Sequence, residues 1–213
     1  MSNIGEYYYT LRHLHLKRRY GQWTARIDPA QVAYIHMSKE WPKHMKKWRF
    51  FVCPGNWDLS ERRYVPFRLE QMKQLFVDQM PYRETDTYKM MLRELRSDGT
   101  TRSPQLKSEN EIDHYFRGIE SLFNSMRNEG YKIRDADSVR RDKEITVRIG
   151  RNGQLIKANE GTHRWAIAIL LELPSVPVVV DLVHPRWVMR CRDEYGGSAV
   201  SAIRGGLDAL GAK

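Results

Sequence analysis

The 213-residue sequence lacks the features that mark several large protein classes. Its two cysteines, Cys53 and Cys191, lie far apart without a CxxC or histidine-rich companion, which argues against a disulfide framework or a thiolate metal site. No apolar run approaches the roughly 20 residues that a membrane span requires. The amino terminus has tyrosines and histidines where a signal peptide would have an apolar core. We therefore expect a cytoplasmic protein without a membrane segment.

The sequence also lacks a Walker A pattern, which excludes an ordinary P-loop enzyme. Acidic residues are scarce in the first fifty positions, where ten Lys and Arg face three Asp and Glu and carry +7 of the formal net charge of +10. The remaining 163 residues are nearly balanced, with 26 basic against 23 acidic residues. A basic segment with interleaved aromatic residues can attract nucleic acid or another polyanion. The alternative is a solvated basic face with no specific partner.

The stretch from Glu144 to His184 predicts one compact unit. Ile145, Val147 and Ile149 alternate with polar residues, which is the period of a half-buried strand. The Asn-Gly pair that follows predicts a hairpin turn, because such turns need positive φ. The elements predicted after this turn are a short strand at 155–158, a polar loop at 159–164, an apolar helix at 165–171 and a buried strand at 176–183.

The polar loop is a candidate anion site, because it places N–H groups and cationic side chains at the start of a helix. Glycine allows a ligand to approach the backbone closely, and an arginine can bind phosphate with two hydrogen bonds. The candidate phosphate-binding residues are Gly161, Thr162, His163 and Arg164. The alternatives are structural: His163 bonds a carbonyl group, or Arg164 pairs with Glu160 or Asp181.

Two loop residues are candidates for catalysis. Glu160 is the acidic group of the loop, and so the candidate general base. His163 can shuttle a proton near neutral pH. A third candidate, the acidic residue Asp58, follows the turn signal Pro54-Gly55-Asn56 and is a candidate metal or substrate ligand. For Asp58 the alternative is a helix cap or a packing role.

The rest of the chain predicts a helical layer and two flanking segments. Residues 66–130 carry apolar residues at helical spacing in three stretches, which predicts three helices inserted into a domain at 27–190. Residues 1–26 form a basic, aromatic arm in this interpretation. Residues 191–213 are rich in glycine and are predicted to be a weakly ordered tail with at most one short helix.

Five short motifs resemble those of a group of ParB-like prokaryotic and viral proteins in the ParB/sulfiredoxin superfamily. The motifs are Trp57-Asp58, Glu84-Thr85-Asp86-Thr87-Tyr88, Gly130-Tyr131, Glu160-Gly161-Thr162-His163-Arg164 and His184-Pro185-Arg186-Trp187. The resemblance covers roughly residues 27–190. It implies an α/β fold with a small mixed sheet, helices and a helical layer, in which the loop Glu160–Arg164 cradles nucleotide phosphates.

The resemblance also narrows the expected function. Thr162 stands where sulfiredoxins have a catalytic cysteine, so sulfinic-acid repair is excluded. Partition proteins of the superfamily have an arginine at the position of His163, and the 26 residues after Trp187 leave no room for their additional domains. Serine-phosphorylating kinases of the superfamily have an acidic-Gly-x-His-Arg loop much like this one, which implies phosphoryl transfer with Mg²⁺.

The sequence therefore predicts a nucleotide-binding protein that uses ATP, ADP or CTP with Mg²⁺. The expected reaction is phosphoryl transfer to a small-molecule acceptor, or nucleotide hydrolysis. The alternative function is a DNA- or RNA-binding module, with or without nuclease activity, that holds nucleic acid through the loop and the basic amino-terminal segment. An inactive scaffold is the third reading.

Overall fold

The computed structural model describes residues 4–32, 34–35, 48, 50–59, 62–63, 67–133, 144–158 and 160–211. The chain divides into two compact units. The sheet unit comprises Met1–Val65, Ile133–Gly161 and Leu173–Lys213, and the helical unit comprises Pro66–Lys132 and Thr162–Glu172. A mixed sheet together with helices confirms the predicted α/β class.

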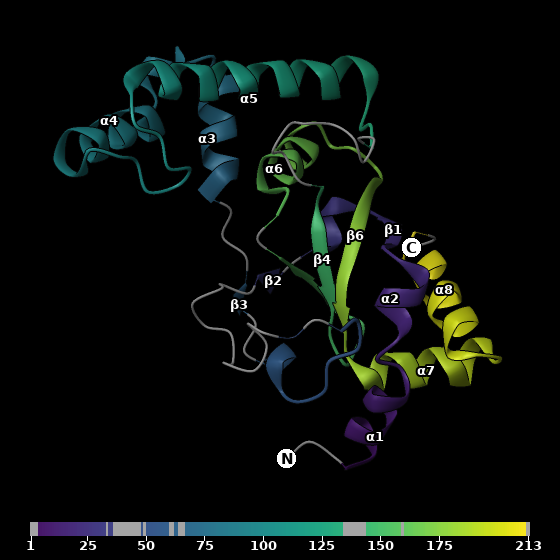
Figure 1. Ribbon diagram of the computed structural model, residues 1–213. Helices are drawn as coiled ribbons and strands as arrows, with labels where there is room; N and C mark the ends of the chain where they lie inside the picture. The colour runs from purple at the N-terminus through teal and green to yellow at the C-terminus, as the bar shows by residue number, and fades with distance from the viewer. Residues whose placement is uncertain are drawn as a thin grey trace. The chain divides into compact units, whose positions relative to one another are not determined.

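The sheet unit is built on a six-stranded sheet with the order β1-β6-β4-β5-β2-β3 (Figure 1). Its strands are β1 (Trp23–Ile27), β2 (Tyr34–Ile35), β3 (Arg62–Arg63), β4 (Thr146–Ile149), β5 (Leu155–Lys157) and β6 (Val176–Val183). The sheet is mixed, because β4 runs parallel to β6 and β5 parallel to β2, while the other three pairs are antiparallel. The parallel pairs need long crossovers, which accounts for the helices between the strands.

The predicted hairpin and the buried strand are confirmed. Strands β4 and β5 pair antiparallel, with Arg148 opposite Ile156, and the turn between them has Gly153 at φ +82°. Strand β6 lies between β1 and β4 and is buried along most of its length, as its almost wholly apolar sequence predicts. The apolar residues Phe50, Phe51 and Val52 also predict a short strand, but the structure reduces it to one bridge between Val52 and Val183.

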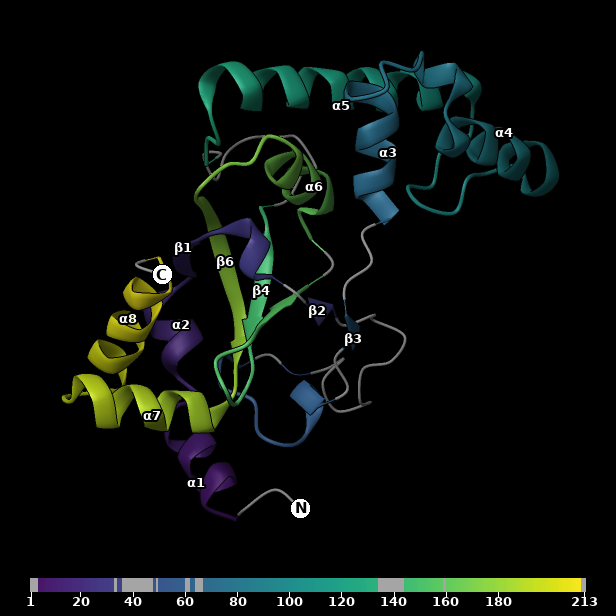
Figure 2. The ribbon, with the colours of Figure 1, turned by 180° about the vertical axis from the view of Figure 1, so that it is seen from behind.

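In the described part of the sheet unit, four α-helices correct the predictions for both ends of the chain. Helices α1 (Ile4–Arg12) and α2 (Leu16–Tyr20) precede β1, which pairs with β6, so residues 1–26 are not a separate arm. Helices α7 (Pro185–Tyr195) and α8 (Ala199–Leu210) replace the predicted weakly ordered tail. Both ribbon views show α8 beside β1 with α7 against it (Figures 1 and 2). The weak order was predicted from the glycine content of this segment. Gly206 instead is buried against Cys191 and Trp187 and allows α7 and α8 to approach closely.

Among its described residues, the helical unit contains the three helices predicted within 66–130 and the helix predicted at 165–171. They are α3 (Phe67–Phe76), α4 (Asp86–Asp98), α5 (Glu109–Glu129) and α6 (Thr162–Leu170). Thr85 and Ser108 cap α4 and α5 by accepting backbone N–H groups, as their side chains favour. Aromatic rings fill the contact between α3 and α5, where Phe76 stacks on Phe123 with ring centroids 3.8 Å apart.

Some predictions fall outside the described residues. These are the basic, aromatic run that the sequence indicates at 41–48, of which only Trp48 is described, the charged connection at 135–143, and Asn159 of the loop. Of the extended stretch that residues 64–67 predict, only Phe67 is described, and it is the first residue of α3. Within the described residues, no helix combines the length and the apolar character that crossing a membrane requires.

Candidate functional site: a polar cluster at the start of helix α6

The predicted loop is divided between the two units. Glu160 and Gly161 end a segment of the sheet unit, whereas Thr162, His163 and Arg164 form the first turn of α6 in the helical unit. The helix therefore begins three residues earlier than the sequence predicts. Since Thr162 and His163 occupy the first turn, their backbone lies at the positive end of the helix dipole.

Gly161 is required by the fold of the sheet unit itself. Its φ of +69° is unfavourable for other residues, and a Cβ atom would lie 2.5 Å from Ile145 Cα and N. The backbone carbonyl of Glu160 accepts hydrogen bonds from Thr146 N and from Lys157 Nζ. The predicted close approach at Gly161 is thus made by the backbone just before strand β4, and its contact with a ligand stays a prediction.

Lys157 is fully buried at the end of β5 and holds the segment before α6. Its Nζ donates to the carbonyl oxygen of Ala158 at 2.6 Å and to that of Glu160. Burial lowers the pKa of Lys157 to about 7, against the opposing effect of the nearby Glu160 carboxylate. Glu160 therefore has a cation beside it, and its predicted role as a general base stays a prediction.

His163 belongs to a hydrogen-bonded cluster inside the helical unit. Its Nε2 lies 2.7 Å from the hydroxyl of Tyr115, and Arg68 Nη1 donates to the same hydroxyl at 3.0 Å. Arg68 Nη1 also donates to Gln71 Oε1 at 2.9 Å. Arg68, Gln71, Tyr115 and His163, which come from α3, α5 and α6, are called the α6 cluster below.

The electrostatics of the α6 cluster keep His163 neutral. Burial, and secondly the charge of Arg68, lower the pKa of His163 to about 3. An arginine only donates, so Tyr115 accepts from Arg68 and has its own proton available for Nε2. This arrangement favours the tautomer with the proton on Nδ1, which makes His163 a neutral hydrogen-bond donor at the start of α6.

Gln71 contributes the unusual feature of the cluster. Its side chain is 2% exposed, and its Oε1 must face Arg68 because a guanidinium cannot accept. Within the described part of the chain, its buried Nε2 has no hydrogen-bond partner. A buried amide donor without an acceptor costs about 1–3 kcal/mol, so an acceptor from outside the chain would fit here.

Arg164 is directed to the end of α5. Its Nη1 donates to the carbonyl oxygen of Lys132 at 3.1 Å, and its guanidinium lies 5.2 Å from the ring centroid of Tyr131. These contacts join two of the motifs that carry the resemblance, since Tyr131 belongs to the Gly130-Tyr131 pair. A bidentate contact of Arg164 with phosphate stays a prediction that these bonds do not favour.

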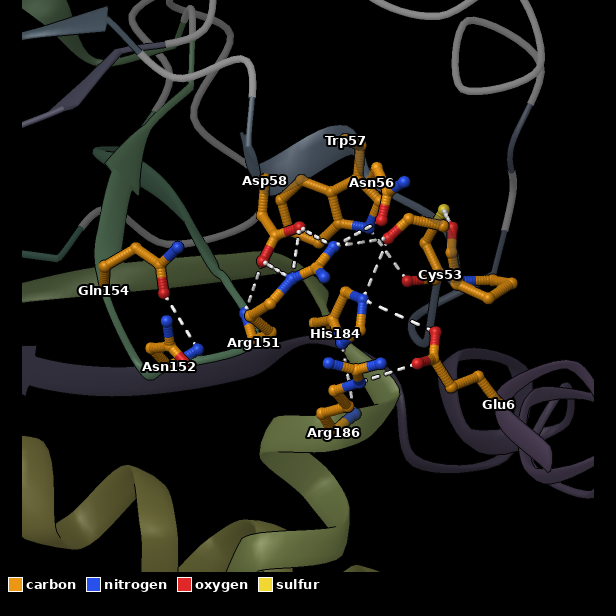
Figure 3. A network of polar contacts seen from close by, with 12 residues as sticks. Glu6, Cys53, Asn56, Trp57, Asp58, Arg151, Asn152, Gln154, His184 and Arg186 are labelled. Carbon is orange, nitrogen blue, oxygen red and sulfur yellow. Dashed lines mark hydrogen bonds and ion pairs between the residues drawn. The ribbon is translucent and has the colours of Figure 1, made fainter. Parts of the chain in front are cut away.

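A second polar cluster lies in the sheet unit and contains Asp58 (Figure 3). Asp58 sits in the turn η4 (Trp57–Leu59) and is fully buried. The Arg151 side chain donates to Asp58 Oδ1 at 2.8 Å and to Oδ2 at 2.9 Å, and the Arg151 backbone N donates to Oδ2 at 2.7 Å. These bonds to Arg151 lower the pKa of Asp58 against the effect of burial.

The cluster continues through His184 to helix α1. His184 Nδ1 accepts from Arg186 N at 3.1 Å, and its Nε2 donates to Gly55 O at 2.9 Å. Arg186 Nε donates to Glu6 Oε1 at 2.6 Å. Burial lowers the pKa of His184, so the histidine is neutral. Two carboxylates thus face two guanidinium groups, and the set sums to zero charge. Glu6, Asp58, Arg151, His184 and Arg186 are called the closed network below.

The closed network corrects the prediction for Asp58. Both of its carboxylate oxygens accept from Arg151, which does not fit a metal ligand, and the described residues hold no group of three or more His, Cys, Asp or Glu that could bind a metal ion. Arg151 lies two residues after the end of β4, whereas the carbonyl oxygen of Glu160 accepts from Thr146 N at the beginning of the strand. Asp58 and Glu160 therefore lie at opposite ends of the strand.

Sequence reasoning missed Arg68, Gln71, Tyr115 and Arg151. Tyr115 stands in the apolar stripe of α5, a position typical of a core residue, although a tyrosine hydroxyl inside the fold needs a hydrogen-bond partner. Arg68 and Gln71 are ordinary residues of a polar helix, so no local pattern marks them. Arg151 precedes the Asn-Gly pair and reads as part of the turn.

In comparisons with known proteins, no family model, curated protein or solved structure matches the chain.

Proposed function

We propose that the first turn of α6 binds the phosphate groups of a nucleotide. The observation that carries the proposal is the buried Nε2 of Gln71, a donor without an acceptor in a cluster that ends on the first turn of a helix. Phosphate oxygens accept hydrogen bonds and are attracted to the positive end of a helix. The donors that would meet them are Nε2 of Gln71, Nδ1 of His163 and the hydroxyl of Thr162.

The charge of the cluster supports an anionic ligand over a cation. Arg68 lies two hydrogen bonds from His163 and lowers its pKa, so the site carries positive potential. A divalent cation alone would be repelled, because both this potential and the start of the helix dipole are positive. Mg²⁺ therefore enters the proposal with the nucleotide, whose phosphates supply oxygen ligands that this cation prefers.

Membership of the ParB/sulfiredoxin superfamily is part of the same proposal. What supports it is the order of hairpin, Gly161, helix α6 and buried strand β6, together with the residues of the motifs. The proposed reaction is phosphoryl transfer to a small-molecule acceptor or hydrolysis of the nucleotide, with Glu160 as the base. Binding is the first step to establish, because either reaction requires it.

The test is a thermal-shift screen of ATP, ADP, CTP and GTP, each with and without Mg²⁺. A ligand at about 100 times its Kd stabilises a protein by about 2.7 kcal/mol, which shifts Tm by a few degrees. We expect such a shift for at least one nucleotide with the native protein, and its loss in His163→Gln.

His114→Gln is the matched control, because His114 is exposed on α5 of the same unit. This variant should retain the full shift. No shift with any nucleotide, or an equal shift in His163→Gln, would contradict the proposed site.

A further inference from the structure

Helix α1 carries its polar residues inward and its apolar residues outward. Glu6 and Thr10 are 4% and 1% exposed, whereas Ile4, Tyr7, Tyr8 and Leu11 are 87%, 49%, 63% and 64% exposed. The inward side is held by the bond of Glu6 to Arg186 and by the hydroxyl of Thr10, which donates to Glu6 O. An amphipathic helix normally packs its apolar side on the core, so the exposed side requires an explanation.

Cations accompany the exposed aromatic rings. The guanidinium of Arg12 lies 5.9 Å from the ring centroid of Tyr8, and that of Arg19 lies 5.8 Å from the ring of Tyr20, which is also exposed. Ile4, Tyr7, Tyr8, Leu11 and Arg12 are called the tyrosine face below.

Nearby charges give this region a positive potential. Glu6 is the one acidic residue among the first 27, and Arg186 already neutralises it. His13, in the turn after α1, has a pKa lowered by burial and then by His15, Arg192 and Arg12. Arg192 comes from α7, so cations of two helices act on one point of this surface.

We propose that the tyrosine face binds single-stranded nucleic acid. Unpaired bases stack on exposed tyrosine rings, and arginines beside the rings contact the phosphates, which is how sequence-tolerant single-strand sites are built. A second copy of the chain is the less favourable occupant. A symmetric contact through this face would bury the guanidinium of Arg12 from both copies on a face that offers no carboxylate to pair with it. Nucleic acid instead provides bases that stack on the rings and phosphates that pair with the cations.

Deletion of the amino-terminal segment is unsuitable as a test, because this segment is part of the fold. Removing residues 1–26 would delete β1 from the edge of the sheet and Leu16 from the core, so lost binding would report an unfolded protein. Exposed side chains allow point variants instead, because they make few contacts with the rest of the chain. Tyr7→Ala/Tyr8→Ala removes two rings, and Arg12→Gln removes one cation.

The experiment is fluorescence anisotropy of a labelled oligothymidine of about 20 nucleotides, longer than the roughly 16 that the largest sites of this type cover. Full-length protein should bind with a strong salt dependence. The double tyrosine variant should weaken binding by roughly tenfold or more. Arg12→Gln should reduce the slope of log Kd against log salt concentration by roughly 0.7.

Arg93→Gln is the control, because it removes the same charge from an exposed position on α4 of the other unit. Binding that Arg93→Gln weakens as much as Arg12→Gln would mean nonspecific attraction and overturn the proposal. So would unchanged binding in the double tyrosine variant. A dimer in light scattering that this variant dissociates would assign the face to a second copy.

Discussion

The closed network and the α6 cluster are both partly buried and both centred on arginine, yet they differ in completeness. In the closed network, Arg151 and Arg186 meet the carboxylates of Asp58 and Glu6, and both nitrogens of His184 have partners. In the α6 cluster, Gln71 Nε2 has no partner among the described residues. A complete, neutral cluster stabilises a fold, whereas an incomplete one leaves a place for a ligand.

This difference in completeness assigns separate roles to the short motifs that carry the resemblance. Trp57-Asp58 and His184-Pro185-Arg186-Trp187 meet in the closed network, which joins α1, the turn η4, the β4–β5 hairpin and the start of α7 (Figure 3). His163 belongs instead to the α6 cluster. We expect substitutions in the first group to act on stability and substitutions in the second to act on binding.

The largest effect should follow from breaking the closed network. Asp58→Ala leaves Arg151 beside a buried position without its carboxylate, and removing one member of a buried ion pair typically costs 3–5 kcal/mol. We therefore expect the free energy of unfolding to fall by about that amount in urea denaturation. Glu129→Ala, which removes an exposed carboxylate that pairs with the exposed Lys132, should cost less than about 1 kcal/mol. Equal costs for the two variants would contradict the assigned role of the network.

Tyr115→Phe should have an intermediate effect. It removes the hydroxyl that links Arg68 to His163 and leaves both groups with one partner fewer. The expected loss is about 1–2 kcal/mol in the free energy of unfolding, together with weaker nucleotide binding. Tyr82→Phe is a suitable control in the same unit, since its ring stacks on Phe116 and would remain in place. Retention of full nucleotide affinity in Tyr115→Phe would show that this hydroxyl plays no part in the binding site.

The pH dependence of stability should also report His163. Its pKa is about 3 in the folded protein and about 6.5 when unfolded, so both states are neutral above pH 6.5. Below that pH the unfolded chain takes up a proton that the folded protein does not, and the free energy of unfolding falls. Urea midpoints at pH 7, 6 and 5 should therefore decrease, and His163→Gln should decrease less. The lowered pKa of His184 acts in the same direction and remains in that variant.

The smallest effect on stability should come from Gln71→Met. The change removes the donor without an acceptor, which favours folding, and also removes the bond to Arg68, which opposes it. We expect a change within about 1 kcal/mol in either direction by urea denaturation. A loss as large as that of Asp58→Ala would mean that Gln71 is a structural residue and that the α6 cluster is complete.

The sequence predicted the helices and strands more accurately than it predicted the closed network and the α6 cluster. The hairpin, β6 and helices α3 to α5 follow from local periodicity, turn residues and caps, which short stretches encode by themselves. The ordered carboxyl-terminal helices were missed because glycine usually signals weak order, whereas Gly206 serves packing between α7 and α8. The partners of His163 come from α3 and α5, about 50 to 95 positions away, and Arg151 meets Asp58 across 93 positions. No local pattern encodes such pairs.

The most direct test of the account is a calorimetric nucleotide titration of Gln71→Glu. The substitution retains the acceptor for Arg68 and nearly the same shape, but replaces the buried donor with a negatively charged acceptor. Gln105→Glu, which adds the same charge at an exposed position of the same unit, is the matched control. We predict that the control binds like the native protein, while Gln71→Glu stays folded and loses at least about 100-fold in affinity, or about 2.8 kcal/mol. Equal affinity in the two variants would contradict a ligand site at the start of α6.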